Sequence, residues 1–141
     1  MTNKIDKYEY IRHQKFKIRY HIIFSTKYRK NFLIGQIAED IKQSMIRASE
    51  GQLWSIELQE IDQNKPNHIH LLIKSTPSIA PYEIVHRLKQ YSTYDLWQKH
   101  HNEMIKYYWS EKHYCWTRGY FCTSIGDACT DTIKKYIETQ G

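Results

Sequence analysis

Two neighbouring β-rich segments joined by a short turn place the strongest constraint on the fold of this chain. Residues 53–62 alternate in polarity, which puts apolar residues such as Ile56 and Leu58 on one face of a predicted strand. Residues 63–66, Gln-Asn-Lys-Pro, have the composition of a turn, and residues 67–74 form a second β-rich run. The pattern predicts an antiparallel β-hairpin in the middle of the chain.

Helical patterns and further strands flank this hairpin. Residues 18–25 are β-rich, and the helical spacing that follows ends at Gly51. The apolar residues of this first helix are Ile34, Ile37, Ala38, Ile41, Met45 and Ala48. A second helix begins near Pro77 and Pro81, because proline is tolerated in the first helical turn. Its apolar stripe comprises Ile84, Val85, Leu88, Tyr91 and Leu96.

The last third of the chain has weaker patterns. Residues 102–114 are polar and aromatic, which predicts a loop with at most a short strand. Residues 117–125 predict another strand, and residues 129–139 predict a final helix. This order favours an α+β fold, in which helices pack on an antiparallel or mixed sheet. At 141 residues, we expect one domain over 1–141, with a basic N-terminal segment at 1–17 and a C-terminal helix at 127–140.

Composition excludes several protein classes. With 40% hydrophobic and 26% charged residues, the chain is neither disordered nor a membrane protein, and its apolar runs are too short to span a bilayer. Three cysteines without an export signal predict reduced thiols and a cytoplasmic location. Cys115, Cys122 and Cys129 match no zinc spacing and favour buried free thiols. The sequence also lacks the phosphate-loop, dinucleotide, GxSxG and HExxH motifs.

Positive charge is concentrated at the start of the chain. The net charge is +6, and the first 30 residues hold nine bases against two acids. A basic end on a near-neutral body is typical of a protein that meets phosphates, although a solvated charged surface has the same pattern. Twelve Tyr, four Trp and four Phe also allow stacking on unpaired bases, although aromatic residues are more often core.

His68-Ile69-His70 is the sharpest chemical feature of the sequence. Because side chains alternate along a strand, both imidazoles lie on one face, and Ile69 lies on the other with Leu71. Two such imidazoles can converge on one divalent cation, whose remaining ligands would come from elsewhere. The alternative is two polar residues on a solvated sheet face.

A second feature is the segment Tyr136-Ile-Glu-Thr-Gln140. Residues four apart share a helix face, so the Tyr136 hydroxyl and the Gln140 amide point the same way. A tyrosine with an ordinary pKa near 10 needs a polarised electrophile to act as a nucleophile, and a cation on a phosphate provides one. From this pentapeptide alone, a surface helix that packs its tyrosine against the sheet is the stronger interpretation.

Together these blocks resemble the small single-tyrosine transposases of single-strand insertion sequences (the IS200-like group), which belong to the HUH superfamily. The resemblance runs from about Tyr20 to Gln140. Its blocks are Lys27-Tyr28-Arg29, His68-Ile69-His70-Leu71-Leu72, Ile84-Val85-x-x-Leu88-Lys89, Trp116-x-Arg118-Gly119-Tyr120-Phe121 and Tyr136-Ile137-Glu138-x-Gln140.

The resemblance implies a ferredoxin-like or RRM-like HUH fold and a specific chemistry. Tyr136 would be the nucleophile, and His68, His70 and Gln140 would hold Mg²⁺ or Mn²⁺. Such proteins cut and rejoin single-stranded DNA at the hairpin-bearing ends of a mobile element through a 5′-phosphotyrosine. They are homodimers, and the tyrosine helix can serve the partner subunit's histidine pair. No membrane partner is expected.

The position before the histidine pair departs from the usual pattern, because Asn67 stands where these transposases usually have Asp. Asn is found there in the related transposases of repetitive palindromes, but the end of this chain favours the mobile-element group. Charge and position, rather than the resemblance, suggest Lys27 and Arg29 as contacts to DNA phosphates, and Arg118 is a further candidate.

Three other hypotheses remain at this stage. A domesticated, palindrome-associated HUH nuclease would share the histidine pair. A non-catalytic single-stranded nucleic-acid-binding module would explain the charge and the rings, but would give no reason for His68, His70, Tyr136 and Gln140 together. A small structural zinc protein lacks enough ligands unless a cysteine joins the pair.

Overall fold

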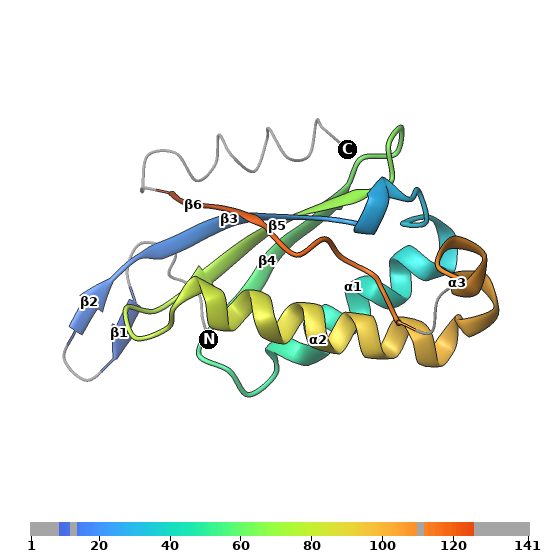
Figure 1. The fold of residues 1–141 in the computed structure, drawn as a ribbon. Coiled ribbons are helices and arrows are strands. Elements are labelled where there is room, and N and C mark those ends of the chain that lie inside the picture. Colours follow the sequence, from blue (N-terminus) through green and yellow to red (C-terminus); the bar gives the residue numbers. More distant parts are fainter. Residues whose placement is uncertain (1–8, 12–13, 110–111, 126–141) are drawn as a thin grey trace.

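A four-stranded antiparallel sheet with two long helices on one face forms the body of the protein (Figure 1). The computed structural model describes residues 9–11, 14–109 and 112–125. The sheet has the order β4-β5-β3-β6, built from β4 (Ser55–Ile61), β5 (His68–Ser75), β3 (Ile18–Ser25) and β6 (Phe121–Ile125). These findings confirm the predicted α+β fold.

The predicted central hairpin is present as β4 and β5, which pair antiparallel around the turn at 62–67. β5 also pairs antiparallel with β3, which has the predicted bounds, and β3 pairs with β6. A separate two-stranded ribbon, β1 (Glu9–Ile11) and β2 (Gln14–Phe16), lies within the segment that the sequence showed only as basic.

One detail of the predicted alternation is wrong. In β4, Ile56 lies opposite Ile73 and Leu58 lies opposite Leu72, so Glu57 is an extra residue in a β-bulge. Because Ile73 and Leu72 are consecutive in β5, Ile56 and Leu58 lie on opposite faces of the sheet and not on one.

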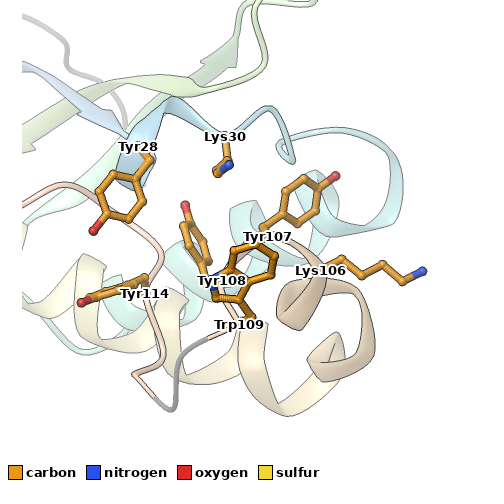
Figure 2. A pocket seen from close by; sticks show the side chains of 7 residues that line it. All are labelled: Tyr28, Lys30, Lys106, Tyr107, Tyr108, Trp109 and Tyr114. Carbon is orange, nitrogen blue, oxygen red and sulfur yellow. The ribbon is translucent and has the colours of Figure 1, made fainter.

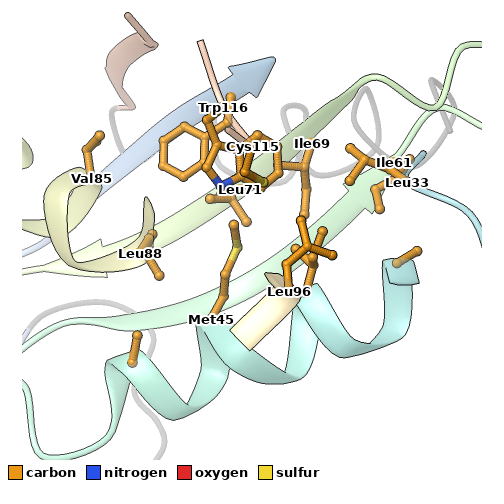
Figure 3. Packing of buried hydrophobic residues seen from close by; sticks show 14 of the residues in the cluster. Leu33, Met45, Ile61, Ile69, Leu71, Val85, Leu88, Leu96, Cys115 and Trp116 are labelled. Atoms are coloured by element: carbon orange, nitrogen blue, oxygen red, sulfur yellow. The ribbon is translucent and has the colours of Figure 1, made fainter. Parts of the chain in front are cut away.

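The two predicted helices are α1 (Gly35–Ser49) and α2 (Pro81–Lys99). α1 ends where Glu50 donates its N–H to the Arg47 carbonyl, and Gly51 then takes a φ of 77°, a conformation that glycine adopts without strain. The helices present their apolar stripes to the sheet face that carries Ile69 and Leu71 (Figure 3). The most deeply buried core residues include Ile22, Phe24, Phe32, Met45, Ile69, Leu71, Ile73, Ile84 and Leu88.

The segment predicted as a loop contains a helix, which is the clearest error of the sequence analysis. α3 (His101–Tyr107) follows α2 directly, and the carbonyl of His100 accepts hydrogen bonds from the N–H groups of Glu103 and Met104. Only Met104 of the seven helical residues is buried, so the helix has almost no apolar periodicity to reveal it.

A short 3-10 turn, η1 (Lys27–Arg29), follows β3. The predicted C-terminal helix at 127–140, with Tyr136 and Gln140, lies outside the described residues, as does Cys129. In the part of the chain that is described, no helix combines the length and the apolar character needed to cross a bilayer.

Candidate active site

His68 and His70 lie at the start of β5, on the sheet face opposite the helices. Ile69 and Leu71, the alternate residues, are fully buried in the core beneath the sheet. The two imidazole centroids are 5.2 Å apart at an interplanar angle of 68°. His70 is 6% exposed, whereas His68 is half-buried. The structure confirms that the two rings share one face of the sheet.

The Nδ1 atom of His68 is held by the preceding residue, Asn67. The Asn67 side-chain NH₂ donates to Asn31 Oδ1 at 3.1 Å, which turns Asn67 Oδ1 toward His68. That oxygen lies 2.9 Å from His68 Nδ1, so it accepts a hydrogen bond from Nδ1–H. The Asn67 backbone is fixed separately, through Lys65 and Thr26. His68 Nε2 therefore keeps its lone pair for another partner.

A third histidine, His21 of β3, holds the corresponding nitrogen of His70. His21 Nε2 lies 3.1 Å from His70 Nδ1, and the two rings are stacked at 5.3 Å and 16°. The pKa of His70 is lowered to about 4, mainly because the ring is buried and further because His21 and His68 lie beside it. Burial also lowers the pKa of His21. Each neutral ring carries one N–H, and the hydrogen bond between the rings holds one proton, on either His21 Nε2 or His70 Nδ1. In the tautomer with that proton on His70 Nδ1, His70 Nε2 also presents a lone pair.

The sequence analysis missed His21. Its only signal was a position within the β-rich run of residues 18–25, because the register of β3 against β5 is not visible in the sequence. In the structure, Ile23 is the direct partner of His70, and His21 is the diagonal neighbour on the same face.

The donor set fits a divalent cation in part. Two neutral imidazoles with anchored Nδ1 atoms are typical metal ligands, and hydrogen bonds at the second nitrogen fix their orientation. Among the residues that the structure describes, no group of three or more His, Cys, Asp or Glu side chains could hold a metal ion. A complete site would therefore need further ligands, such as the predicted Gln140, which lies outside those residues together with Tyr136.

The structure brings the basic candidates Lys27, Arg29 and Arg118 to the same end of the sheet as His68. The N–H of Thr26, which precedes Lys27, donates to the Asn67 carbonyl at 2.8 Å. The N–H of Thr117 donates to the carbonyl of Ser25, the register partner of His68. Arg29 and Arg118 are exposed, whereas Lys27 is half-buried and lies over two tyrosine rings.

Lys89 of α2 fixes the loop that carries Arg118. Its Nζ donates to three successive carbonyls, those of Thr117, Arg118 and Gly119, at 2.9, 3.2 and 3.0 Å. The ammonium also lies 5.4 Å from the centroid of Phe24. This contact explains why a lysine stands at the end of the Ile84-Val85-x-x-Leu88-Lys89 block: it ties the helix layer to the segment entering β6.

The two described cysteines, Cys115 and Cys122, take part in no group of three or more side chains that could hold a zinc ion. Cys115 is buried and Cys122 is half-buried, both are free thiols, and burial raises the pKa of each. The prediction of buried free thiols is confirmed for Cys115.

Comparison with known proteins agrees with this geometry. A profile of the IS200-like transposases matches residues 14–140, which is nearly the whole chain. The chain belongs to the IS200-like transposase family. The matched range contains the histidine pair, the basic residues Lys27 and Arg29, and the segment with Tyr136 and Gln140.

Two individual proteins are also similar to this chain. The ISDra2 transposase TnpA of Deinococcus radiodurans is 32% identical over 77 residues, which cover 52% of this chain and 51% of that relative. The match therefore spans about half of the relative's length. A solved structure of a candidate transposase from Deinococcus radiodurans has a TM-score of 0.73 at 23% identity, covering 94% of this chain and 97% of the other. At that identity the structural likeness shows the shared fold.

Proposed function

We propose that this chain is a metal-dependent transposase that cuts and rejoins single-stranded DNA at the hairpin-bearing ends of an insertion sequence. The observation that carries the proposal is the pair His68 and His70, whose Nδ1 atoms are both held by neighbouring side chains. The supporting side chains come from β3 and from the residue before β5, and a strand that served only to pack the sheet would not need them. Membership of the IS200-like family supplies the reaction class.

In this proposal His68, His70 and Gln140 hold Mg²⁺ or Mn²⁺. When bound there, the cation would polarise the scissile phosphate and stabilise the charge that develops on it. The structural contribution of the described residues is orientation, because Asn67 and His21 hold the two imidazoles through their Nδ1 atoms. Nε2 of each ring is the proposed ligand atom.

Tyr136 is the proposed nucleophile. Its hydroxyl oxygen attacks the phosphorus, the bond from phosphorus to the 3′-oxygen breaks, and a 5′-phosphotyrosine and a 3′-hydroxyl result. The phenol proton passes to water, and the departing 3′-oxygen takes up a proton. The reverse reaction with another 3′-hydroxyl rejoins the strand without a nucleotide cofactor, because the phosphodiester energy is retained in the tyrosyl ester.

The DNA is proposed to lie along the basic end of the sheet. Lys27, Arg29 and Arg118 flank His68 there and would contact backbone phosphates. A homodimer, in which the tyrosine helix of one subunit serves the histidine pair of the other, is part of the proposal.

Strand cleavage with a matched metal-binding measurement tests the proposal. The substrates are a labelled single-stranded hairpin from an end of the element and the corresponding duplex. We expect cleavage of the single strand in Mg²⁺ or Mn²⁺ and no cleavage in chelator. We expect His68→Ala and His70→Ala to lose both cleavage and Mn²⁺ binding. Mn²⁺ binding is measured by electron paramagnetic resonance. Hairpin binding that is unchanged in chelator, without any cleavage, would instead support a non-catalytic binding module.

A further inference from the structure

An aromatic pocket opens at the end of the sheet that carries His68 (Figure 2). It has a volume of about 380 Å³ and lies between the turn η1 and the end of α3. The aromatic pocket is lined by Tyr28, Tyr107, Tyr108, Trp109, Tyr114, Lys30 and Lys106. Five aromatic rings and two lysines thus share one hollow, and none of its lining residues in the described part of the chain carries a carboxylate.

The floor of the pocket is rigid. Tyr108 is buried, and its hydroxyl donates to the Lys27 carbonyl at 2.6 Å. The Tyr108 ring meets the rings of Tyr114 and Phe32 edge-on, at 5.8 and 6.0 Å. The backbone N–H of Lys27 also donates to the Cys115 carbonyl, which ties the two walls together. The pocket is therefore preformed and does not need a ligand to assemble it.

Two rings at the rim are exposed in a way that core packing does not explain. Trp109 is 93% exposed and Tyr28 is 67% exposed. Tyr28 takes a φ of 60°, a left-handed conformation that is unfavourable for a bulky residue. The turn is closed by Thr26, whose hydroxyl donates to the Lys30 carbonyl at 2.7 Å. The chain thus accepts backbone strain at the residue that presents a tyrosine ring to solvent.

Positive charge surrounds these rings. Lys30 and Lys106 are exposed at the pocket, and the Lys27 ammonium lies 5.3 Å from the centroid of Tyr28 and 5.0 Å from that of Tyr114. Aromatic faces bind flat, uncharged ring systems, and ammonium groups bind phosphates. A nucleotide in a single strand combines both chemistries, whereas a duplex keeps its bases inside its own stack.

The aromatic pocket is connected to the proposed catalytic site through the backbone. Thr26 donates its N–H to the carbonyl of Asn67, and the Asn67 side chain orients His68. Tyr28 is two residues beyond Thr26. A strand whose phosphate lies at His68 can therefore extend its next unpaired bases toward the pocket.

We propose that the aromatic pocket binds one unpaired nucleobase of the single-stranded DNA beside the cleavage site, stacked against Tyr28 and Trp109, with its flanking phosphates on Lys30 and Lys106. This inference rests on the proposed function for its choice of ligand. It adds a base-binding site that anchors the strand independently of the metal and the nucleophile.

Trp109 provides an internal reporter for the test. The other three tryptophans, Trp54, Trp97 and Trp116, are at most 8% exposed, so a neutral quencher such as acrylamide selectively reaches Trp109. We expect a short oligothymidylate to protect the tryptophan fluorescence from acrylamide, and we expect an abasic strand of equal length not to do so. Trp109→Phe should remove the quenchable signal while keeping the binding.

Binding measurements with variants complete the test. Trp109→Ala and Tyr28→Asn should each weaken oligothymidylate binding about 10-fold, the size expected for one stacked base, and leave abasic-strand binding unchanged. Asn tolerates the left-handed conformation at position 28, so that variant retains the turn. The matched control is Tyr94→Ala, which removes a tyrosine that is 65% exposed on α2; it should bind like the wild type.

The outcomes separate this inference from the proposed function. Equal binding of oligothymidylate and abasic strand by wild type and variants would overturn the base site, even if the wild type cleaves DNA. Loss of base preference in the variants would support the site, even if no cleavage occurs. Protection of Trp109 that rises with protein concentration in the absence of DNA would also overturn it, because a second copy of the chain would then cover the pocket.

Discussion

Replacement of Asn67 tests whether the histidine pair is oriented for a metal. In Asn67→Ala the acceptor 2.9 Å from His68 Nδ1 is lost, and so is the 3.1 Å hydrogen bond to Asn31. The Asn67 backbone keeps its own bonds to Lys65 and Thr26, so the strand start stays in place. Metal ligands that lose such a supporting partner typically bind about 10–100-fold more weakly.

The expected loss of stability is smaller than the expected loss of metal affinity. A side-chain hydrogen bond contributes about 1 kcal/mol net, and the freed His68 and Asn31 groups are accessible enough to bond to water. The total cost is therefore about 1 kcal/mol, or about 2–4 °C in Tm for a chain of this size. A 10–100-fold loss of affinity corresponds to about 1.4–2.7 kcal/mol, and it acts on metal binding alone.

The assay is a Mn²⁺ titration followed by electron paramagnetic resonance, paired with thermal unfolding in chelator. Asn67→Asp keeps the acceptor and adds a negative charge, so we expect it to bind Mn²⁺ at least as tightly as the wild type. Asn64→Ala, in the exposed turn of the same hairpin, is the matched control and should change neither quantity. If Asn67→Ala bound Mn²⁺ as tightly as the wild type, the orienting role of Asn67 would be refuted.

Three further substitutions test how the sheet and its loops are held. Glu57→Gln should lower the free energy of unfolding in urea by about 3 kcal/mol, because it leaves the 2%-exposed Arg19 without the carboxylate that lies 2.7 Å away. A loss below about 1 kcal/mol would mean that the pair behaves like a surface ion pair. Lys89→Met removes three charge-assisted hydrogen bonds to the loop before β6, so it should lower the free energy of unfolding by about 2 kcal/mol and speed amide hydrogen exchange in that loop. Unchanged exchange would show that the lysine does not fix the loop. Ser92→Ala leaves the buried indole N–H of Trp116 without the hydroxyl acceptor at 2.9 Å, so the free energy of unfolding should fall by about 1–3 kcal/mol. Ser92→Thr restores a hydroxyl and should recover part of that loss.

The parts of the fold that sequence patterns predicted are those whose buried residues stand out in the sequence. The apolar stripe of α2 follows the helical period of 3.6, and β3 and the β4–β5 hairpin are short β-rich runs bounded by charged or turn residues. α3 was missed because its residues are mostly exposed and its start depends on the His100 carbonyl. The bulge at Glu57 was missed because one extra residue in a strand leaves the composition unchanged, although it moves Leu58 to the other face.

The candidate site was predictable only where its residues are adjacent in sequence. His68 and His70 share a face because of simple alternation within one strand. His21 and Asn31 could not be found this way. His21 meets His70 through strand register across 49 positions of the chain, and Asn31 meets Asn67 through loop packing across 36. Tyr28 and Trp109 were two rings among twenty in the sequence, and only the fold shows that they stand at the rim of one pocket.

Covalent trapping of the protein on DNA tests the central claim most directly. Wild type and Tyr136→Phe would each be incubated with a labelled single-stranded hairpin end in Mg²⁺, in Mn²⁺ and in chelator, then separated on a denaturing gel with the adduct mapped by mass spectrometry. The account predicts a metal-dependent adduct on the 5′-phosphate side of the cut, attached at Tyr136 and absent from Tyr136→Phe. An adduct that persists in Tyr136→Phe, or cleavage without any covalent protein–DNA species, would contradict it.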